Sequence, residues 1–438
     1  MKSDDALLAA WEETLAQRRD TPAIFDTRGE VLRTFRDIES RARDLENKIS
    51  GSVYPIDLGN QPDWPSHLLA ALRRQVVALP LESTITLPQR EAALRLCEGA
   101  AWEEAPPVLL KLTSGTTAAP RAIRFRSEQL LADCIQICAT MGIGGHDVNF
   151  GVIPLSHSYG FSNLVTPLLA RGVAMVLSRD RMPRAVLDDL ACTGATVFPG
   201  MPVFYQAFCE MENPPALPKL RLCISAGAPL PLETARKFRE KFQRSIHSFY
   251  GSSECGGICY DREARLEEAG FVGPPMDGVK IEMLESNVAS SRIRIQSAAA
   301  GDGYFPEPDP EKLAAGFFAP DDLLSPSGNG FRIVGRVSDV INVAGKKVNP
   351  AEVEAELLRF DGVRAAVVFG RESVLRNEEV AACVAASAAV RETELLEFCR
   401  HRLSGWQVPK RIFFVDEIPV NERGKISRRE LAQRFSSR

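Results

Sequence analysis

The sequence predicts an α/β protein: a large N-terminal domain of layered, mostly parallel sheets with helices, and a small α+β C-terminal domain. Three observations predict this organisation. The chain has 438 residues, which is too long for one hydrophobic core. From residue 53 to about residue 250, strand-like runs alternate with helix-like runs, a pattern typical of parallel sheets covered by helices. From about Gly270 to Gly335, short strands with Gly, Pro and Asp turns indicate a β-rich subdomain.

Periodicity and turn signals place the elements in order. Residues 1–20 carry Leu7, Leu8, Trp11 and Leu15 on one helical face. Further helices are expected at residues 35–49, 64–74, 87–97, 127–141, 184–191, 202–210 and 232–242, with Ser127 as a possible N-cap. Strands are expected at residues 23–25, 31–34, 53–58, 76–79, 108–112, 122–125, 149–155, 173–177, 196–198, 222–225 and 245–250.

The pattern changes again after residue 335. We therefore predict an N-terminal domain at residues 1–335 and a C-terminal domain at residues 336–438, about a hundred residues and an ordinary domain size. Helices are expected in this second part at residues 350–358 and 392–403, and strands at residues 363–369, 380–386 and 412–415. A polar loop at residues 421–425 and a short basic helix follow.

Composition and charge exclude several classes of function. The net charge of −4 argues against a nucleic-acid partner, which normally needs a concentrated basic face. The chain opens on no signal segment, and no apolar run is long enough for a membrane span. Most of the ten cysteines lie in apolar segments, which is typical of reduced core residues, so a cytoplasmic location is expected. The cysteine pairs 134/138 and 255/259 lack further ligands for a structural zinc ion.

One polar loop stands out at residues 113–121, directly after the apolar run 108–112. Its sequence is Thr-Ser-Gly-Thr-Thr-Ala-Ala-Pro-Arg. Such a loop offers backbone N–H groups and hydroxyls on one surface and a guanidinium at its end, which suits a polyphosphate. The Walker pattern G-x-x-x-x-G-K-[ST] is absent from the chain. The alternative is a Ser/Thr-rich surface turn.

Three more polar, Gly-containing clusters follow predicted strands, at residues 156–160, 225–229 and 250–257. Ligands of α/β sheets bind at the carboxyl ends of strands. Each cluster alone has an ordinary structural interpretation, because Ser and Gly are common in turns. Four clusters at strand ends in one chain indicate a composite ligand site.

Taken together, these stretches resemble the adenylate-forming superfamily of acyl- and aryl-CoA synthetases, peptide-synthetase adenylation domains and luciferases. The resemblance runs in order from about residue 22 to the C-terminus. Its motifs are the phosphate loop 113–121, the acyl-pocket motif 153–157, the adenine-side segment 225–230, the Tyr-Gly-Ser-Ser-Glu motif 250–254, the hinge Gly335-Arg336-x-x-Asp339, the segment 345–352 and the catalytic loop Gly424-Lys425 with Arg428.

The resemblance implies a two-step reaction: a carboxylate attacks the α-phosphate of ATP with loss of pyrophosphate, and a thiol then takes the acyl group. Lys425 would bridge the carboxylate and the α-phosphate, with Arg121 as a further catalytic cation. Glu254 would hold Mg²⁺ with a hydroxyl of Thr116 or Thr117. The implied nucleotide-binding residues are Thr113, Ser114, Gly115, Thr116, Thr117, Ala226, Gly227, Ala228, Tyr250, Gly251, Ser253, Asp322 and Arg336. The ribose contact is open between Asp321 and Asp322.

The remaining implied roles concern the acid, the thiol and the hinge. The acid would meet His157, Ser158 and Gly160. Gly345 and Lys346 would approach CoA or a carrier-protein phosphopantetheine, although surface lysines such as Lys346 and Lys347 also serve solubility. The small domain would rotate at about Ser338, since hinges are a few residues that absorb a backbone change.

Two departures from the family pattern lie in the phosphate loop. Ala118 stands at the usual Gly, and Arg121 stands at the usual Lys. Arg keeps the charge and adds a planar fork, so phosphate binding is expected to survive in altered geometry. No Asp or Glu occurs between Asn149 and Ala170, where amino-acid-activating members carry an acid for the substrate ammonium. We therefore expect a fatty or aromatic acid without an α-amino group.

Three functions stay open at this point. The first is an acid–CoA ligase, and the second is an acyl-adenylate ligase that loads a carrier protein. The third is a non-catalytic nucleotide-binding protein. Retention of Lys425, Glu254 and Arg336 argues against the third.

Overall fold

The computed structural model describes residues 5–97, 102, 106–113, 121–265, 268–285, 290–373, 377–419 and 428–435. The chain divides into two compact units. Unit 1 comprises Met1–Met283, Arg294–Pro320 and Pro326–Arg332, and unit 2 comprises Leu284–Ile293, Asp321–Ser325 and Ile333–Arg438. The expected α/β class is confirmed, with helices and mostly parallel sheets in unit 1.

Among the described residues, the largest sheet of unit 1 has eight strands in the order β12-β11-β10-β9-β7-β8-β1-β2. Its strands are β1 (Pro22–Phe25), β2 (Val31–Thr34), β7 (Val148–Gly151), β8 (Ala174–Leu177), β9 (Val197–Gly200), β10 (Leu222–Ser225), β11 (Ile246–Ser252) and β12 (Gly256–Tyr260). The strands from β11 to β1 run parallel. The segments after β7, β10 and β11 therefore leave the same edge, which brings three of the predicted clusters to that edge.

A second sheet of unit 1 carries the ends of the fourth cluster. Its described strands are ordered β16-β6-β5-β4-β3. They are β3 (Val53–Ile56), β4 (Val77–Pro80), β5 (Leu109–Leu112), β6 (Ala122–Phe125) and β16 (Gly303–Phe305). β3, β4 and β5 run parallel, whereas β5 and β6 are antiparallel neighbours. The loop of residues 113–121 thus joins two adjacent antiparallel strands.

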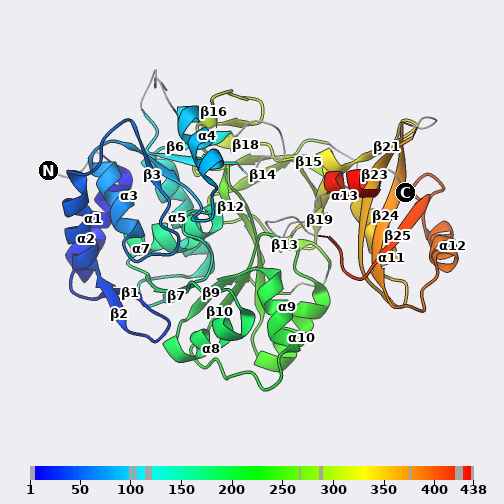
Figure 1. The fold of residues 1–438 in the computed structure, drawn as a ribbon, viewed down its shortest axis with the longest axis horizontal. Coiled ribbons are helices and arrows are strands. Elements are labelled where there is room, and N and C mark those ends of the chain that lie inside the picture. Colours follow the sequence, from blue (N-terminus) through cyan, green and yellow to red (C-terminus); the bar gives the residue numbers. More distant parts are fainter. Residues whose placement is uncertain are drawn as a thin grey trace. The chain divides into compact units, whose positions relative to one another are not determined.

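Helices cover these sheets. They are α1 (Ala6–Arg18), α2 (Phe35–Glu46), α3 (Trp64–Arg73), α4 (Leu87–Cys97), α5 (Ser127–Met141), α6 (Ser158–Gly160), the π-helical turn η1 (Phe161–Val165), α7 (Thr166–Arg171), α8 (Pro183–Thr193), α9 (Pro202–Glu210) and α10 (Leu232–Phe242). α1, α2 and α3 lie together at the blue end of Figure 1, and α9 lies beside α10. Local signals explain the boundaries: α2 opens with a capping box between Thr34 and Asp37, and α5 ends at Gly142 with φ of 62°.

Short strands follow β12, as the sequence predicts for the stretch after Gly270. They are β13 (Phe271–Gly273), β14 (Lys280–Met283), β15 (Ser291–Gln296), β17 (Leu313–Ala314), β18 (Phe317–Phe318), β19 (Asp322–Ser327) and β20 (Gly330–Arg336). β13 pairs with β20, and β18 pairs with both β15 and β17, all antiparallel.

Unit 2 is built on another mixed sheet. Its later elements are η2 (Val337–Asp339), β21 (Ile341–Val343), β22 (Lys346–Val348), α11 (Pro350–Leu357), β23 (Val363–Ser373), β24 (Asn377–Ala386), α12 (Glu392–Arg402), β25 (Arg411–Val415) and α13 (Arg428–Phe435). The described strands are ordered β22-β21-β24-β23, and β25 runs parallel to β24. α11 and α13 both lie against β23 (Figure 1).

Two local predictions are wrong. Arg126, not Ser127, is the N-cap residue of α5, and the Ser127 hydroxyl instead donates to Asp5. The strand expected at residues 149–155 ends at Gly151. The backbone groups of Ile153 and Leu155 bond to the side chain of Asn60 rather than to a neighbouring strand.

In the described ranges, no helix has the length and apolarity to cross a membrane.

Candidate active site

The loop of residues 113–121 is closed at its base by backbone contacts. Thr113 N donates to Arg121 O at 2.8 Å, and Thr113 Oγ1 donates to the same oxygen at 3.2 Å. The ladder between β5 and β6 continues up to this point, so both ends of the loop are fixed by the sheet. The predicted phosphate and metal contacts Ser114, Gly115, Thr116 and Thr117, and the departure Ala118, lie outside the described residues.

Arg121 stands at the exit of this loop and faces Tyr304 of β16. Its guanidinium carbon lies 4.2 Å from the centre of the Tyr304 ring, and Nη2 donates to Glu307 O at 3.0 Å. Nε is buried and has no hydrogen-bond partner among the described residues. A buried N–H without a partner costs free energy, which a hydrogen-bond acceptor at this place would recover.

Tyr304 connects this cation to Glu254, the predicted metal ligand. The Tyr304 hydroxyl donates to Glu254 Oε1 at 3.2 Å. Glu254 lies in the turn between β11 and β12, and its carbonyl accepts from Gly301 N at 2.9 Å. Burial raises the pKa of the Glu254 carboxyl, and hydrogen bonds that include the one from Tyr304 oppose the rise. A carboxylate held in a partly desolvated turn is suited to bind a hard cation.

Sequence reasoning missed two buried residues of opposite charge, Lys111 and Asp133, which influence each other electrostatically. Lys111, in the middle of β5, is 5% exposed, and its Nζ lies 4.6 Å and 5.0 Å from the ring centres of Phe125 and Phe161. Burial lowers the pKa of Lys111, and the charges of Asp133 and Glu254 oppose this. Burial likewise raises the pKa of Asp133, which Lys111 opposes. The signal in the sequence was a single charge inside an apolar strand.

Asp133 extends from α5 to the turn that carries Glu254. Its Oδ1 accepts from Gly257 N at 3.0 Å. A Cβ added to Gly256 would lie 2.0 Å from this oxygen, so only Gly fits there while Asp133 remains in place. Asp133 thereby joins the helix to the start of β12, directly after the turn that carries Glu254.

Ser158 and Ser253 bring two predicted motifs together. Ser158 Oγ donates to Ser253 Oγ at 2.8 Å across 95 positions of sequence. His157 is the N-cap residue of α6, and its Nδ1 accepts from Tyr159 N at 3.2 Å. The residue after the acyl-pocket motif therefore lies next to the motif that contains Glu254.

Tyr159 and Gly160 explain the close packing of this corner. The Tyr159 hydroxyl donates to Gly200 O at 3.2 Å at the end of β9. A Cβ on Gly160 would lie 2.0 Å from Pro154 O, a distance that real Cβ atoms do not adopt. Gly160 is required here for backbone approach.

Asn60 holds the same segment from the N-terminal side and was missed by sequence reasoning. Its Nδ2 lies 3.1 Å from Gly151 O and 3.2 Å from both Ile153 O and Ser178 O. Its Oδ1 accepts from Leu155 N at 3.0 Å. The backbone that leads into His157 is thus satisfied by one amide side chain, which is why β7 stops at Gly151.

The predicted adenine-side segment follows β10. Ala226 N donates to Gly200 O at 3.3 Å, and Gly227 has φ of 86°, so the chain turns sharply there. Gly227, Ala228 and Gly251 are exposed, whereas Tyr250 is 8% exposed. The hydroxyl of Ser225 is buried and unpartnered within the described part of the chain.

Unit 2 carries the predicted ribose and hinge residues. Arg336 Nε donates to Asp322 Oδ1 at 2.8 Å, and the Asp322 side chain is 13% exposed. Asp321 O accepts from Val337 N at 2.7 Å. Asp322 is therefore a carboxylate that pairs with Arg336. Ser338 lies in η2, and its side chain is outside the described atoms.

Gly345 and Lys346 lie at the turn between β21 and β22. Gly345 has φ of 85°, and its N–H donates to Asn342 Oδ1 at 2.9 Å. Lys346 Nζ lies 3.7 Å from the ring centre of Trp406. The predicted catalytic Lys425, with Gly424, falls outside the described residues.

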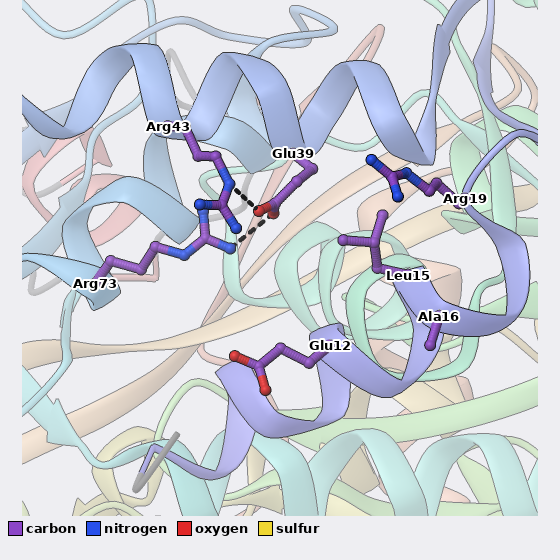
Figure 2. A pocket seen from close by; sticks show the side chains of 7 residues that line it. All are labelled: Glu12, Leu15, Ala16, Arg19, Glu39, Arg43 and Arg73. Atoms are coloured by element: carbon purple, nitrogen blue, oxygen red, sulfur yellow. Dashed lines mark hydrogen bonds and ion pairs between the residues drawn. The ribbon is translucent and has the colours of Figure 1, made fainter. Parts of the chain in front are cut away.

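A separate hollow lies among α1, α2 and α3 (Figure 2), with a volume of about 400 Å³. Glu39 stands at its centre, accepts from Trp11 Nε1 at 2.9 Å, and pairs with Arg43 and Arg73 at 2.7 Å each. No residue predicted for binding or catalysis lines it.

Two regions of the chain match the profiles of one enzyme family. Residues 98–291 match the profile described as AMP-binding enzyme, and residues 352–425 match the profile described as AMP-binding enzyme C-terminal domain. Together they span more than half of the chain. The chain belongs to the adenylate-forming AMP-binding enzymes.

Named relatives of this adenylate-forming enzyme act on different acids. The feruloyl-CoA synthase of Amycolatopsis sp is 28% identical over 342 residues, which cover 75% of this chain and 70% of that protein. The 3,4-dihydroxybenzoate–[aryl-carrier protein] ligase of Bacillus anthracis is 28% identical over 327 residues, which cover 74% and 73%.

Solved structures share the fold over nearly the whole chain. ATP-bound MatB from Rhodopseudomonas palustris superposes with a TM-score of 0.85 at 21% identity, covering 98% of each chain. The o-succinylbenzoate CoA synthetase of Bacillus subtilis with its acyl-adenylate intermediate gives 0.81 at 22% identity, covering 96% of this chain and 97% of that chain. At these identities the likeness establishes the fold of the adenylate-forming enzyme.

Proposed function

We propose that this protein uses ATP to activate a carboxylic acid as an acyl-adenylate, releases pyrophosphate, and then transfers the acyl group to the thiol of CoA. The observation that carries the proposal is the assembly of Arg121, Tyr304 and Glu254 beside the loop of residues 113–121. An unpartnered guanidinium N–H and a partly desolvated carboxylate are suited to a nucleotide phosphate and its cation. Membership of the AMP-binding family supports this use of the groups.

In the first step, two anions must meet: the substrate carboxylate and the α-phosphate of ATP. Fixed cations and donors lower the barrier because they stabilise charge that develops in the transition state. Arg121 lies over the Tyr304 ring, its buried Nε has no partner among the described residues, and its charge is assigned to the phosphates. Lys425 is assigned to bridge the carboxylate and the α-phosphate as a compact point charge.

Glu254 would hold Mg²⁺. Its carboxylate is a hard oxygen ligand, and Tyr304 holds it in one orientation. The ion, when bound, neutralises charge on the phosphates of ATP. Thr116 or Thr117 is assigned as its hydroxyl ligand, and Thr113 marks the start of the same loop.

The acid is proposed to be fatty or aromatic and to lack an α-amino group. The stretch from Asn149 to Ala170 contains no Asp or Glu and is mostly buried, although His157 is exposed. A buried ammonium without a carboxylate would be unfavourable. His157 and Ser158 begin the helical segment at this place and are assigned to the acid.

The thiol acceptor is proposed to be CoA, with a carrier-protein phosphopantetheine as the alternative. Both acceptors share the pantetheine thiol, and Gly345 with Lys346 is assigned to its approach. The relatives named above include a CoA synthase and an aryl-carrier-protein ligase. The alternative is favoured if holo-carrier protein, but not CoA, accelerates product formation.

The test is pyrophosphate release from Mg-ATP with a panel of fatty, aryl and amino acids, with and without CoA. We expect release that depends on a fatty or aryl acid and is accelerated by CoA. Glu254→Gln should abolish most of it, whereas Glu240→Gln, on the exposed face of α10, should not. Release that requires an amino acid would contradict the substrate class, and wild-type activity in Glu254→Gln would contradict the metal assignment.

A further inference from the structure

Arg428 is the first residue of α13, and each of its three guanidinium nitrogens donates a hydrogen bond. Nε donates to Val368 O at 2.9 Å, and Nη1 donates to Asp339 Oδ2 at 2.7 Å. Nη2 donates to Glu354 Oε1 at 2.8 Å and to Oε2 at 3.1 Å. The three partners come from β23, η2 and α11, so one side chain joins four elements of unit 2.

These contacts form a rigid arrangement. The planar guanidinium fork fixes the directions of its donors, which a lysine ammonium does not. Glu354 Oε1 also accepts from Val368 N at 2.7 Å. Both backbone groups of Val368 are therefore engaged with the same charged cluster. The side chains of Arg428, Asp339 and Glu354 are 29%, 25% and 16% exposed, which limits screening of their charges by solvent.

The rest of α13 is fixed by packing. Leu431 is 2% exposed and Phe435 is 4% exposed, and both lie in one apolar cluster with Val367 and Phe369 of β23. The Phe435 ring centre lies 4.5 Å from that of Phe413. Arg428 is thus the point at which the chain enters a fixed helix.

The positions of Arg428 and Asp339 in the sequence relate this charged cluster to Lys425 and to the predicted hinge. Lys425 precedes Arg428 by three residues, so the two Cα atoms are at most about 11 Å apart. On the other side of the cluster, Asp339 directly follows the predicted hinge residue Ser338. One ion pair therefore connects the residue after the hinge with the residue that ends the lysine segment.

We propose that Arg428 is a positioning residue for the adenylate-forming step: its pairs with Asp339 and Glu354 fix the segment that carries Lys425 relative to the hinge segment within unit 2. The inference rests on the proposed function, because it assigns Lys425 to that step alone. It assigns no contact with substrate to Arg428.

The experiment compares the two half-reactions in Arg428→Lys and Asp339→Asn. We expect kcat of acid-dependent ATP–pyrophosphate exchange to fall about 10- to 100-fold, as for loss of hydrogen bonds between charged groups, with the KM for ATP little changed. Thioester formation from preformed acyl-adenylate and CoA should stay near the wild-type rate. The double variant should lose no more exchange activity than the more impaired single variant, because each single substitution already breaks the same pair between Arg428 and Asp339. Arg434→Lys, an exposed position of the same helix, is the matched control.

Three outcomes would overturn the inference. Normal exchange in both variants would show that the pair does not position the lysine. Equal loss of both half-reactions with a lower Tm would show a merely structural role. Unchanged amide hydrogen exchange over residues 421–431 in Arg428→Met would show that nothing is anchored, and this readout needs no activity. Failure of the proposed function is distinct, since wild-type protein would then show no acid-dependent exchange at all.

Discussion

Asn60 offers the sharpest test of how the acyl-side segment is held. The two N–H groups of Nδ2 can donate to two of the three surrounding carbonyls at a time, and Oδ1 accepts from Leu155 N. Asn60→Ala therefore removes about three hydrogen bonds at roughly 1 kcal/mol each. We expect the free energy of unfolding to fall by about 3 kcal/mol. We also expect the KM for the acid to rise more than the KM for ATP, because the loosened backbone leads into His157.

The assay is urea unfolding followed by Trp fluorescence, since Trp11 and Trp64 are fully buried in unit 1. Asn60→Asp should be worse than Asn60→Ala, because it places a carboxylate against carbonyl oxygens. Gln61→Ala, at the next position, loses only an exposed contact to Arg179 and should change stability by less than about 0.5 kcal/mol. A change that small in Asn60→Ala would refute the reasoning.

Three further predictions concern other contacts. The Asp147 side chain is fully buried, and burial raises its pKa. Hydrogen bonds, led by the one from Arg221, outweigh this effect, so the pKa of Asp147 lies below its ordinary value of 3.8. The stability that the Asp147 carboxylate contributes is therefore lost as the pH falls through the folded pKa. Asp147→Asn should cost about 2 kcal/mol at pH 7, discounted because Arg221 is 39% exposed. The deficit in urea midpoint should shrink as the pH is lowered through the folded pKa of Asp147, and a deficit that grows would contradict this. Ala344 has φ of 50° in a two-residue hairpin turn, so Ala344→Asn should raise the unfolding free energy of unit 2 by about 0.5 kcal/mol, and a lower Tm would oppose this. Tyr304→Phe removes the donor to Glu254 and should raise the Mg²⁺ concentration for half-maximal pyrophosphate release about tenfold, with an unchanged Mg²⁺ dependence as the contrary result.

Many helices and strands of the fold could be predicted from local sequence patterns. The helices at residues 87–97, 202–210 and 232–242 begin and end where periodicity and Pro or Gly signals place them. The pattern failed where a distant side chain competes with the local signal. The strand that begins at Val148 is shorter than expected because Asn60 binds the backbone after it. The N-cap residue of α5 is Arg126 instead of Ser127, because the Gln129 side chain accepts from the Arg126 N–H.

The candidate site was only partly accessible in the same way. Short motifs identify Glu254, Ser158 and Ser253, and the structure brings these three together with Tyr304. Tyr304 itself carries no local signal, because its role arises from a strand pairing with residues 122–124. The loop residues 114–120 and Lys425 keep their assigned roles as predictions.

The buried charges of Lys111 and Asp133 have a consequence for how this sequence can change over generations. Each charge opposes the pKa shift that burial imposes on the other, so replacing either residue alone removes a favourable interaction from the buried charge that remains. The two positions lie on different elements, yet a substitution at one changes the cost of burying the charge at the other. Descendants of this chain are therefore expected to change these two positions together.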